Sequence, residues 1–549
     1  EIRLSLVGSE MCIRDRASTA YSELRRLNLL PLVWWGMAGS LFISLASWGA
    51  GAGYAVDSWL VPLHLDWLCY GHGQLLCQFL FWGGVLLLIG NWARLGRHLL
   101  THHYEDNTRT VSALVLLSLI WMVPFLIANP ILSRDVFSYL AQGSIQRSGA
   151  SAYDVGPNVL NSPGHITPLY LDVSGDWRNT TTPYGPLHLG LMELIVFITQ
   201  DHIHAGVFLV KLLCMLCMVG IIWASQDIAK SLKTSSLWAL WCAGANPLML
   251  LHLIGGMHNE ALMVALMAIG LALVLRRKHV LGIAVITLGA AIKATAFIAL
   301  PFVIWIWLAH IRQDGKTLQK ATPQEQEDDS TVENTSESYG KIVGYFIATA
   351  CGGAVLSIAI FAVLSLATGT GLGFIEALEG SGKVINWLTI PTVLAHFIHA
   401  MGANIDGPSF ASALVGARHI CSLIMGILII PIWIHYRKTP LAALRGLALS
   451  FLVLCLFNSL AFPWYYSWIL VFVGALALNR TSLRIIAALC SWNCFTVLPN
   501  GVIALYNYFW VITAIVIGVI VYRYLGKEET TSSADLERHC LRTPHNFTS

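Results

Sequence analysis

Residues suited to acid–base chemistry follow the third long apolar run of the chain. The segment NPILSRDVFSYLAQGSIQRSG (129–149) begins with a proline-containing pair that ends the preceding helix. Asp135, Tyr139 and Gln142 then recur at i, i+4 and i+7, which places them on one face of a short amphipathic helix. Beside Arg134, Asp135 can act as a general base or bind a cation, and it can equally be an N-cap of the helix. Spacing alone leaves both interpretations open.

The same region continues with aromatic, acidic and turn-forming residues. Tyr153 and Asp154 precede a Gly-Pro pair, and Tyr184 lies in the segment TPYGPL (182–187). Aromatic rings near Asp and Gly suit sugar recognition, because rings stack on the C–H faces of a pyranose. They equally suit an ordered loop with tight turns.

A second polar group is His258-Asn259-Glu260, which follows two glycines and opens an otherwise apolar helix. The glycines permit a sharp turn. Asn259 and Glu260 could simply cap the helix, but a cap needs only one such residue, so we predict a functional role. His258 and Lys293 could bind phosphate.

Other candidates lie near predicted helix ends. Arg418 opens a helix and is another candidate for phosphate binding. Trp464 and Tyr465 belong to the turn FPWYY (462–466), which can be an interfacial aromatic belt or a substrate contact. Lys211 lies about two turns inside its helix, from which it can snorkel to the membrane surface.

Several common site types are absent from the sequence. We find no Gly-rich P-loop, no H-E-x-x-H motif, no G-x-S-x-G motif and no His spacing typical of zinc sites. The net charge of +3 is too small to indicate nucleic-acid binding. A nucleotide-dependent or hydrolase-type site is therefore not predicted.

The elements that must hold these residues are predicted to be membrane helices. The chain has 549 residues, of which 56% are hydrophobic and 11% are charged. Soluble domains carry roughly 25% charged residues, so this composition excludes a soluble globular enzyme. We expect an all-α, polytopic transmembrane bundle of about 13–14 spans, with short juxtamembrane helices in a large outer loop. The apolar runs lie near 29–50, 75–93, 111–129, 204–225, 236–254, 258–275, 280–294, 296–310, 342–368, 418–436, 441–461, 464–478, 484–498 and 503–523.

Lys and Arg in short loops predict the orientation of the bundle. Most of the 33 basic residues fall in loops that we assign to the cytoplasm, which places both chain ends inside. Segment 185–200 is then a juxtamembrane helix on the outer surface, since a crossing there would invert every later loop. Residues 280–310 are predicted as two short helices that turn near Lys293. The polar candidates all fall on the outer side, at the boundary of the lipid bilayer.

This topology divides the chain into consecutive regions. Residues 1–16 resemble translated sequencing-adapter sequence and are left out of the fold argument. Residues 311–341 are polar and acidic, so we expect a flexible cytoplasmic loop there. The predicted regions are a cytoplasmic N-terminus (1–28), three transmembrane helices (29–129), an outer catalytic loop (130–203), transmembrane helices (204–310), the flexible loop (311–341), C-terminal transmembrane helices with an outer loop at 369–417 (342–525), and a cytoplasmic tail (526–549).

Together these motifs resemble the polyprenol-phosphate-mannose-dependent α-1,6-mannosyltransferases. These are membrane glycosyltransferases of the GT-C class, known from lipomannan assembly in actinobacteria. The resemblance covers about residues 25–525, and the family more often has His-Asn-Asp where this chain has His-Asn-Glu. It rests on RDVFSY (134–139), AQG (141–143), AYDVGP (152–157), Trp177, PYGPL (183–187) and HNE (258–260).

The resemblance implies a polyprenyl-phosphate-mannose donor and a glycan or glycolipid acceptor, joined at the extracytoplasmic face of the plasma membrane. Asp135 would be the catalytic base that takes a proton from the acceptor hydroxyl as it attacks C1 of mannose with inversion. Basic groups such as Lys293, Arg418 or His258 would stabilise the departing phosphate. A divalent metal is possible, and no other cofactor is expected. The predicted substrate contacts are Arg134, Tyr139, Gln142, Tyr153, Asp154, Tyr184, His258, Asn259, Glu260, Lys293, Arg418, Trp464 and Tyr465.

Two alternatives stay open at this point. A GT-C transferase could use another lipid-linked sugar, such as arabinose. A flippase or transporter of lipid-linked glycans should instead have a polar cavity through the bilayer midplane, often with inverted repeats. This sequence shows no repeat and groups its polar residues at one edge.

Overall fold

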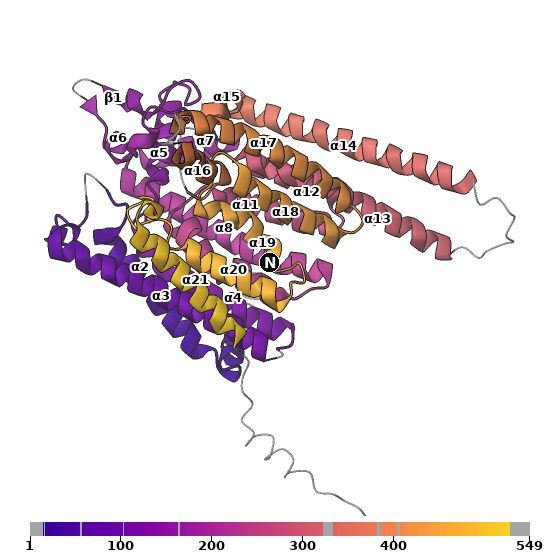
Figure 1. Ribbon diagram of the computed structural model, residues 1–549, viewed down its shortest axis with the longest axis horizontal. Coiled ribbons are helices and arrows are strands. Elements are labelled where there is room, and N and C mark those ends of the chain that lie inside the picture. Colours follow the sequence, from indigo (N-terminus) through magenta and orange to yellow (C-terminus); the bar gives the residue numbers. More distant parts are fainter. Residues whose placement is uncertain are drawn as a thin grey trace, which may run out of the picture.

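The protein is a bundle of apolar helices with a cap of short elements at one end (Figure 1). In this computed structural model the described residues are 15, 17–54, 58–102, 104–162, 165–321, 333–380, 385, 387–402 and 407–527. Most of the predicted N-terminal segment 1–16 and C-terminal tail 526–549 therefore lies outside the described residues. Within them the fold is all-α apart from one two-stranded ribbon, as predicted.

The first half of the chain alternates long helices with the short elements of the cap. Strands β1 and β2 pair antiparallel, with Asn161 opposite Ile166. The elements are α2 (Leu30–Ala50), η1 (Asp66–Cys69), α3 (Gly71–Thr101), α4 (Thr108–Met122), η2 (Val123–Ile127), α5 (Asp135–Arg147), η3 (Pro157–Leu160), β1 (Asn161–Ser162), β2 (His165–Ile166), α6 (Pro168–Asp172), η4 (Gly175–Trp177), α7 (Pro186–Thr199) and α8 (Ile203–Leu232).

The second half is more interrupted. η5 is one turn of π-helix, and a bend of 43° separates α9 from the α10–η5 segment. The elements are α9 (Ser236–Ala243), α10 (Pro247–Met249), η5 (Leu250–Gly255), α11 (Glu260–Leu275), α12 (His279–Ala290), η6 (Ala294–Ile298), α13 (Ala299–Ala321), α14 (Glu333–Thr368), α15 (Phe374–Gly380), α16 (Ile390–Gly402), α17 (Phe410–His435), α18 (Pro440–Phe457), η8 (Pro463–Tyr466), α19 (Ser467–Val473), α20 (Arg480–Asn493), η9 (Ala504–Tyr506) and α21 (Tyr508–Gly526).

The predicted count of 13–14 spans is too high by the criterion of helix length. Nine described helices are long and apolar enough to cross a membrane, or up to ten if the bent α9–α10 pair counts as one span. The apolar runs at 258–275, 280–294, 464–478 and 484–498 do form helices, namely α11, α12, α19 and α20, but each has fewer than 18 residues. Turns lie at the ends of these short helices, and those turns carry several of the candidate site residues.

Two further predictions can be compared with the helix bounds. The segment 185–200 forms the short helix α7, and 280–310 forms two helices that turn near Lys293, as expected. The predicted loop 311–341 is shorter than expected, because α13 continues to Ala321 and α14 begins at Glu333. The remaining part of that loop lies outside the described residues.

Close backbone contacts join the central helices. A Cβ on Gly270 would lie 2.7 Å from the carbonyl oxygen of Gly282, and a Cβ on Gly282 would lie 2.7 Å from that of Gly270, so glycine at both positions lets α11 and α12 touch. Trp92 and Trp241 stack with ring centroids 4.4 Å apart, and each indole N–H donates to the other residue's carbonyl oxygen. These contacts fix α3 against α9 in the core.

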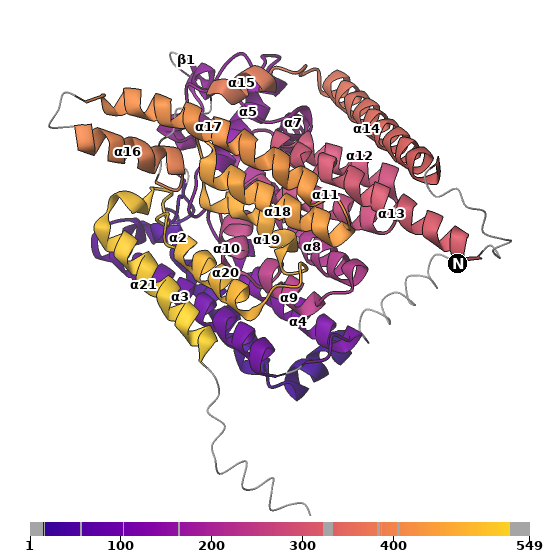
Figure 2. The same ribbon diagram turned by 45° about the vertical axis from the view of Figure 1, so that its right-hand side comes forward.

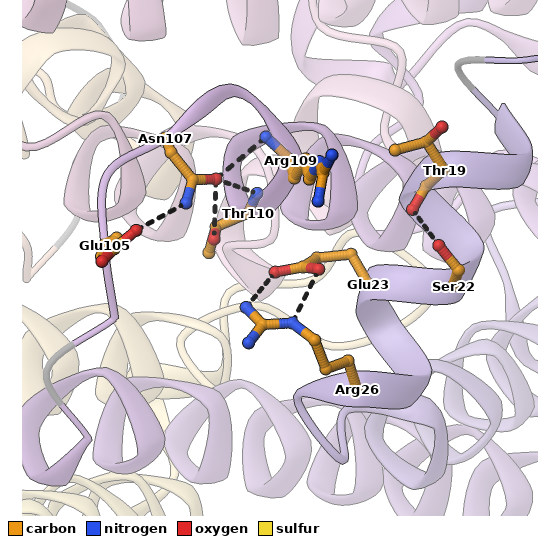
Figure 3. Close-up of polar contacts among 8 residues, drawn as sticks. All are labelled: Thr19, Ser22, Glu23, Arg26, Glu105, Asn107, Arg109 and Thr110. Atoms are coloured by element: carbon orange, nitrogen blue, oxygen red, sulfur yellow. Dashed lines mark hydrogen bonds and ion pairs between the residues drawn. The ribbon is translucent and has the colours of Figure 1, made fainter.

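The ends of the bundle differ in character. Elements α5, α7, β1 and α15 gather at one end in both views, whereas α14 runs along an edge of the bundle (Figures 1 and 2). Near the N-terminus, Glu23 is buried and accepts hydrogen bonds from Arg26, while Asn107 caps α4 by accepting from the N–H groups of Arg109 and Thr110 (Figure 3). The hydrogen bond from Arg26 lowers the pKa of Glu23.

Candidate active site

The carboxylate of Asp135 lies at the first residue of α5, close to the surface of the cap. Its side chain is 16% exposed, and its backbone N–H donates to Oγ of Ser133 at 3.0 Å. Arg134 occupies the N-cap position, and its own side chain makes no capping hydrogen bond. The helix is therefore as predicted, but the structure does not support the interpretation of Asp135 as a simple cap.

His258 lies directly behind this carboxylate. Its Nδ1 is 3.3 Å from Oδ2 of Asp135, and its ring stacks on Trp464 with centroids 3.5 Å apart and planes inclined by 16°. The imidazole is fully buried. A Cβ on Gly256 would come within 2.9 Å of the His258 ring, so glycine is required for this close turn. The geometry suits His258 for orienting Asp135, and direct binding of phosphate by His258 stays a prediction.

Both segments that bring these two side chains together contain a strained residue. Leu132 has a φ of 62° and Met257 has a φ of 51°, in the left-handed region that costs a non-glycine residue about 1–2 kcal/mol. The N–H of Ile131 donates to the carbonyl oxygen of Gly255 at 3.1 Å, which joins the two segments directly. Such strain persists only where the surrounding structure enforces it, as it does at functional sites.

A buried ion pair forms the second part of the site. The side chain of Lys293 is 16% exposed, and its ammonium contacts the carboxylate of the fully buried Glu260. The ammonium also lies over the ring of Tyr465, 4.4 Å from its centroid. Burial by itself would lower the pKa of Lys293, but the charge of Glu260 and the neighbouring tyrosines outweigh burial and raise it. Lys293 therefore stays cationic at neutral pH.

Tyrosines connect the two parts. The charges of Asp135, Lys293 and Glu260 all act on Tyr184 and Tyr465. Burial raises the pKa of Tyr465 to about 12. Both carboxylates and the ammonium thus belong to one electrostatic cluster. Asn259 is buried, and its N–H donates to the hydroxyl of Tyr139 at 3.4 Å.

Several residues that were predicted to contact the substrate already form hydrogen bonds with other residues of the protein. The guanidinium of Arg134 donates to the carbonyl oxygen of Asp172 at 2.9 Å and to its Oδ1 at 3.0 Å. Burial lowers the pKa of Arg134. Gln142 is buried and accepts a hydrogen bond from Thr182 at 3.1 Å. These partners indicate roles in holding the cap together, so substrate contact by Arg134 and Gln142 stays a prediction.

The remaining predicted residues divide between the cap and another part of the bundle. The hydroxyl of Tyr153 donates to the carbonyl oxygen of Tyr184 at 2.9 Å. The next residue, Asp154, is exposed at the end of the turn 152–154. Arg418 lies on α17, which packs chiefly against α16 and α18. A phosphate-binding role for Arg418 therefore stays a prediction.

Two buried residues of this region were missed or misread from the sequence. His188 packs against the rings of Tyr139 and Tyr184, with centroids 4.9 and 4.6 Å apart, and its position four residues after Tyr184, in the first turn of α7, could have indicated it. Lys211 is only 2% exposed, and its ammonium donates to the carbonyl oxygen of Ala128. The prediction that Lys211 snorkels to the surface is therefore wrong.

The described residues hold no group of three or more His, Cys, Asp or Glu side chains arranged to bind a metal ion. Glu260 is engaged by Lys293, and Asp135 contacts His258. These described side chains therefore do not form a site that could hold a cation with protein ligands alone.

Comparison with known proteins decides the family. The family model described as "Alpha-(1->6)-mannopyranosyltransferase, N-terminal domain" matches residues 33–309, which include Asp135, His258, Glu260 and Lys293. The chain belongs to the alpha-(1->6)-mannopyranosyltransferase family. A second model, described as "MptB C-terminal domain", matches residues 391–526. The resemblance inferred from the cap motifs is thus confirmed, and the protein is a membrane glycosyltransferase of the mannosyltransferase class.

Individual relatives extend over almost the whole chain. The chain is 37% identical over 481 residues to alpha-(1->6)-mannopyranosyltransferase A of Mycobacterium tuberculosis, covering 87% of each protein. It is 35% identical over 485 residues to the protein of the same name from Corynebacterium glutamicum, covering 86% of this chain and 94% of that one. Alpha-(1->6)-mannopyranosyltransferase B of Corynebacterium glutamicum is 26% identical over 515 residues.

Proposed function

We propose that the protein transfers mannose from polyprenyl-phosphate-mannose to a hydroxyl of a glycan or glycolipid acceptor. The product is an α-1,6 linkage formed with inversion at C1, at the extracytoplasmic face of the plasma membrane. The names of the relatives support the sugar and the linkage. The observation that carries the proposal is a partly exposed carboxylate, Asp135, backed by the buried His258 and grouped with the cationic Lys293.

In the proposed reaction Asp135 is the general base. Its carboxylate takes the proton of the acceptor hydroxyl while that oxygen forms a bond to C1 of mannose. The bond from C1 to the phosphate oxygen breaks, and the polyprenyl phosphate leaves with the electron pair. One displacement inverts the anomeric centre, so a β-linked donor gives an α-linked product. A positioned general base contributes about 10²–10⁴-fold to the rate.

Lys293 would offset the charge that develops on the leaving phosphate. Its side chain is 16% exposed, and its ammonium is held by the buried Glu260, so a ligand would approach it from the exposed side. A cation kept in place before the reaction stabilises developing charge without reorganisation. The ring of Tyr465 lies beside this ammonium. Sugar contact by Trp464 and Tyr465 stays a prediction, because Trp464 already stacks on His258 and Phe462, and Tyr465 stacks on Trp468.

A divalent metal fits this proposal only with ligands from the substrate. Mg²⁺ commonly binds one or two carboxylates together with substrate phosphates, and Asp135 could supply one such oxygen. Measuring transfer with and without a chelator, and after adding Mg²⁺ or Mn²⁺, tests this possibility.

The decisive experiment uses the purified full-length protein in detergent or proteoliposomes. Synthetic polyprenyl-phosphate-mannose and a short α-mannoside acceptor are incubated with it, and the product linkage is determined by methylation analysis. We expect a new α-1,6-mannosyl residue. Transfer from polyprenyl-phosphate-arabinose but not from the mannose donor would overturn the sugar assignment. Movement of lipid-linked glycan across the membrane without sugar transfer would overturn the enzyme assignment.

A further inference from the structure

The segment Ala128–Arg134, here called the strap, connects η2 to α5 and carries Asp135 at its end. Its backbone is bonded to separate parts of the bundle, including α2, the turn after α2, η5 and the turn that follows α20. The bonds run from the N–H of Asn129 to Oγ of Ser47 (2.8 Å), from the N–H of Ala52 to the oxygen of Pro130 (2.8 Å), from the N–H of Ile131 to the oxygen of Gly255 (3.1 Å), and from the N–H of Leu132 to the oxygen of Pro499 (2.8 Å).

Lys211 contacts the first residue of the strap. It projects from α8, is 2% exposed, and donates to the carbonyl oxygen of Ala128. Ala128 is the C-cap residue of η2, so this carbonyl lies at the end of a helix where a positive charge is favourable. The ammonium therefore joins α8 to the point where the strap begins.

A buried ammonium within a membrane span is costly, and such groups commonly mark functional positions. An uncharged side chain of similar volume would fill the space on α8 without that cost. Simple packing is thus a poor explanation for lysine here, and the exposed fraction excludes snorkelling. The remaining feature is the bond to the strap.

We propose that Lys211 is a positioning residue, which fixes the strap so that the carboxylate of Asp135 meets both His258 and the acceptor hydroxyl. This inference rests on the proposed function, because it assumes that Asp135 is the base. Small errors of position slow catalysis strongly, since a displacement of about 1 Å can lower the rate about 10²-fold. Lys211 touches neither the ion pair of Lys293 nor the aromatic rings, so substrate binding does not depend on it.

Lys211→Met, which keeps the side chain unbranched and only one atom shorter and removes the donor, tests the proposal in the transfer assay. We expect kcat to fall about 10–100-fold while KM for donor and acceptor stays within about twofold. Lys230→Met on the same helix is the matched control, because Lys230 is exposed and bonds only to the side chain of Gln226. We expect wild-type kcat for this control.

A second pair of variants tests the same proposal if Lys211→Met does not fold. Ser47→Ala removes another bond to the strap with little change in volume, so kcat should fall severalfold at unchanged KM. Ser44→Ala is its control on the same helix, because the Ser44 hydroxyl donates only to the carbonyl of Ser40. The double variant Lys211→Met/Ser47→Ala should be non-additive, since both changes act on one segment.

Wild-type kcat in either Lys211→Met or Ser47→Ala would overturn the positioning role. A fall in kcat matched by an equal fall in the folded fraction, measured by size-exclusion chromatography and thermal unfolding, would also overturn it. Asp135→Asn is assayed alongside. If Asp135→Asn retains transfer, the proposed function fails whatever the lysine variants do. If Asp135→Asn is inactive while Lys211→Met is normal, only the positioning role fails.

Discussion

The Nδ1 atom of His258 lies 3.3 Å from Oδ2 of Asp135, and the same imidazole is stacked on Trp464. These three residues come from a cap helix, a turn before α11 and a turn before α19. The carboxylate is open to the surface on one side and supported by a buried ring on the other. A base that must keep a fixed direction toward its substrate needs this arrangement.

Asp135→Asn should abolish most transfer while leaving the fold intact. An amide cannot accept the acceptor's proton, so we expect a loss of about 10²–10⁴-fold in kcat. Transfer of radiolabelled mannose to a short acceptor measures the effect. Asp66→Asn, a change of an exposed aspartate in η1, is the matched control and should be fully active. Near-normal transfer by Asp135→Asn would remove this residue from the mechanism.

Gly256→Ala should damage the site through shape alone. The added Cβ would lie 2.9 Å from the His258 ring and 2.9 Å from the carbonyl oxygen of His252, so the imidazole must move away from Asp135. We expect transfer to fall about 10²-fold. Gly83→Ala in α3 meets nothing within 4 Å and is the control. Equal activity of the two variants would show that the position of His258 is unimportant.

Lys293→Met should destabilise the protein by leaving Glu260 charged and unpaired in the interior. Removing one partner of a buried ion pair costs about 3–5 kcal/mol. The double variant Lys293→Met/Glu260→Leu should recover much of this loss, because no uncompensated charge remains. Thermal unfolding in detergent measures both. A double variant no more stable than Lys293→Met would show that the pair is not the cause of the loss.

His188→Phe should reduce the sensitivity of the fold to acid. Burial, together with the nearby charge of Lys293, lowers the pKa of His188 from 6.5 to about 3. Between these values the unfolded chain binds a proton that the folded state does not, so His188 favours the folded state above pH 6.5 and loses this contribution as the pH falls toward 3.

The expected slope from this one proton is about 1.4 kcal/mol of stability per pH unit. Phenylalanine keeps the ring contacts with Tyr139 and Tyr184 and removes the proton. Thermal unfolding between pH 4 and pH 7 should therefore show a flatter profile for His188→Phe than for the wild type. His202→Gln changes an exposed histidine near the end of α7 and should keep the wild-type profile. Identical profiles for wild type and His188→Phe would contradict the prediction.

The sequence determined the helices and the end of the bundle at which the polar groups meet. Apolar runs specify buried helices whatever their partners, so α2, α8 and α18 lie where the sequence predicts. Alternation of successive helices then places Asp135, His258 and Lys293 at one end without any knowledge of contacts. The length of each helix is harder to predict from the sequence. The apolar run 236–254, for example, is divided by a 43° bend between α9 and the α10–η5 segment.

Only the tertiary structure decided which polar group meets which. Arg134 pairs with Asp172, and Lys293 pairs with Glu260. Lys211 points inward to Ala128 rather than outward to the membrane surface. Each partner lies more than 30 residues away along the chain, so no local pattern encodes the choice. A buried charge must find the partner that the packed helices bring within reach, and that distance exists only in the folded protein.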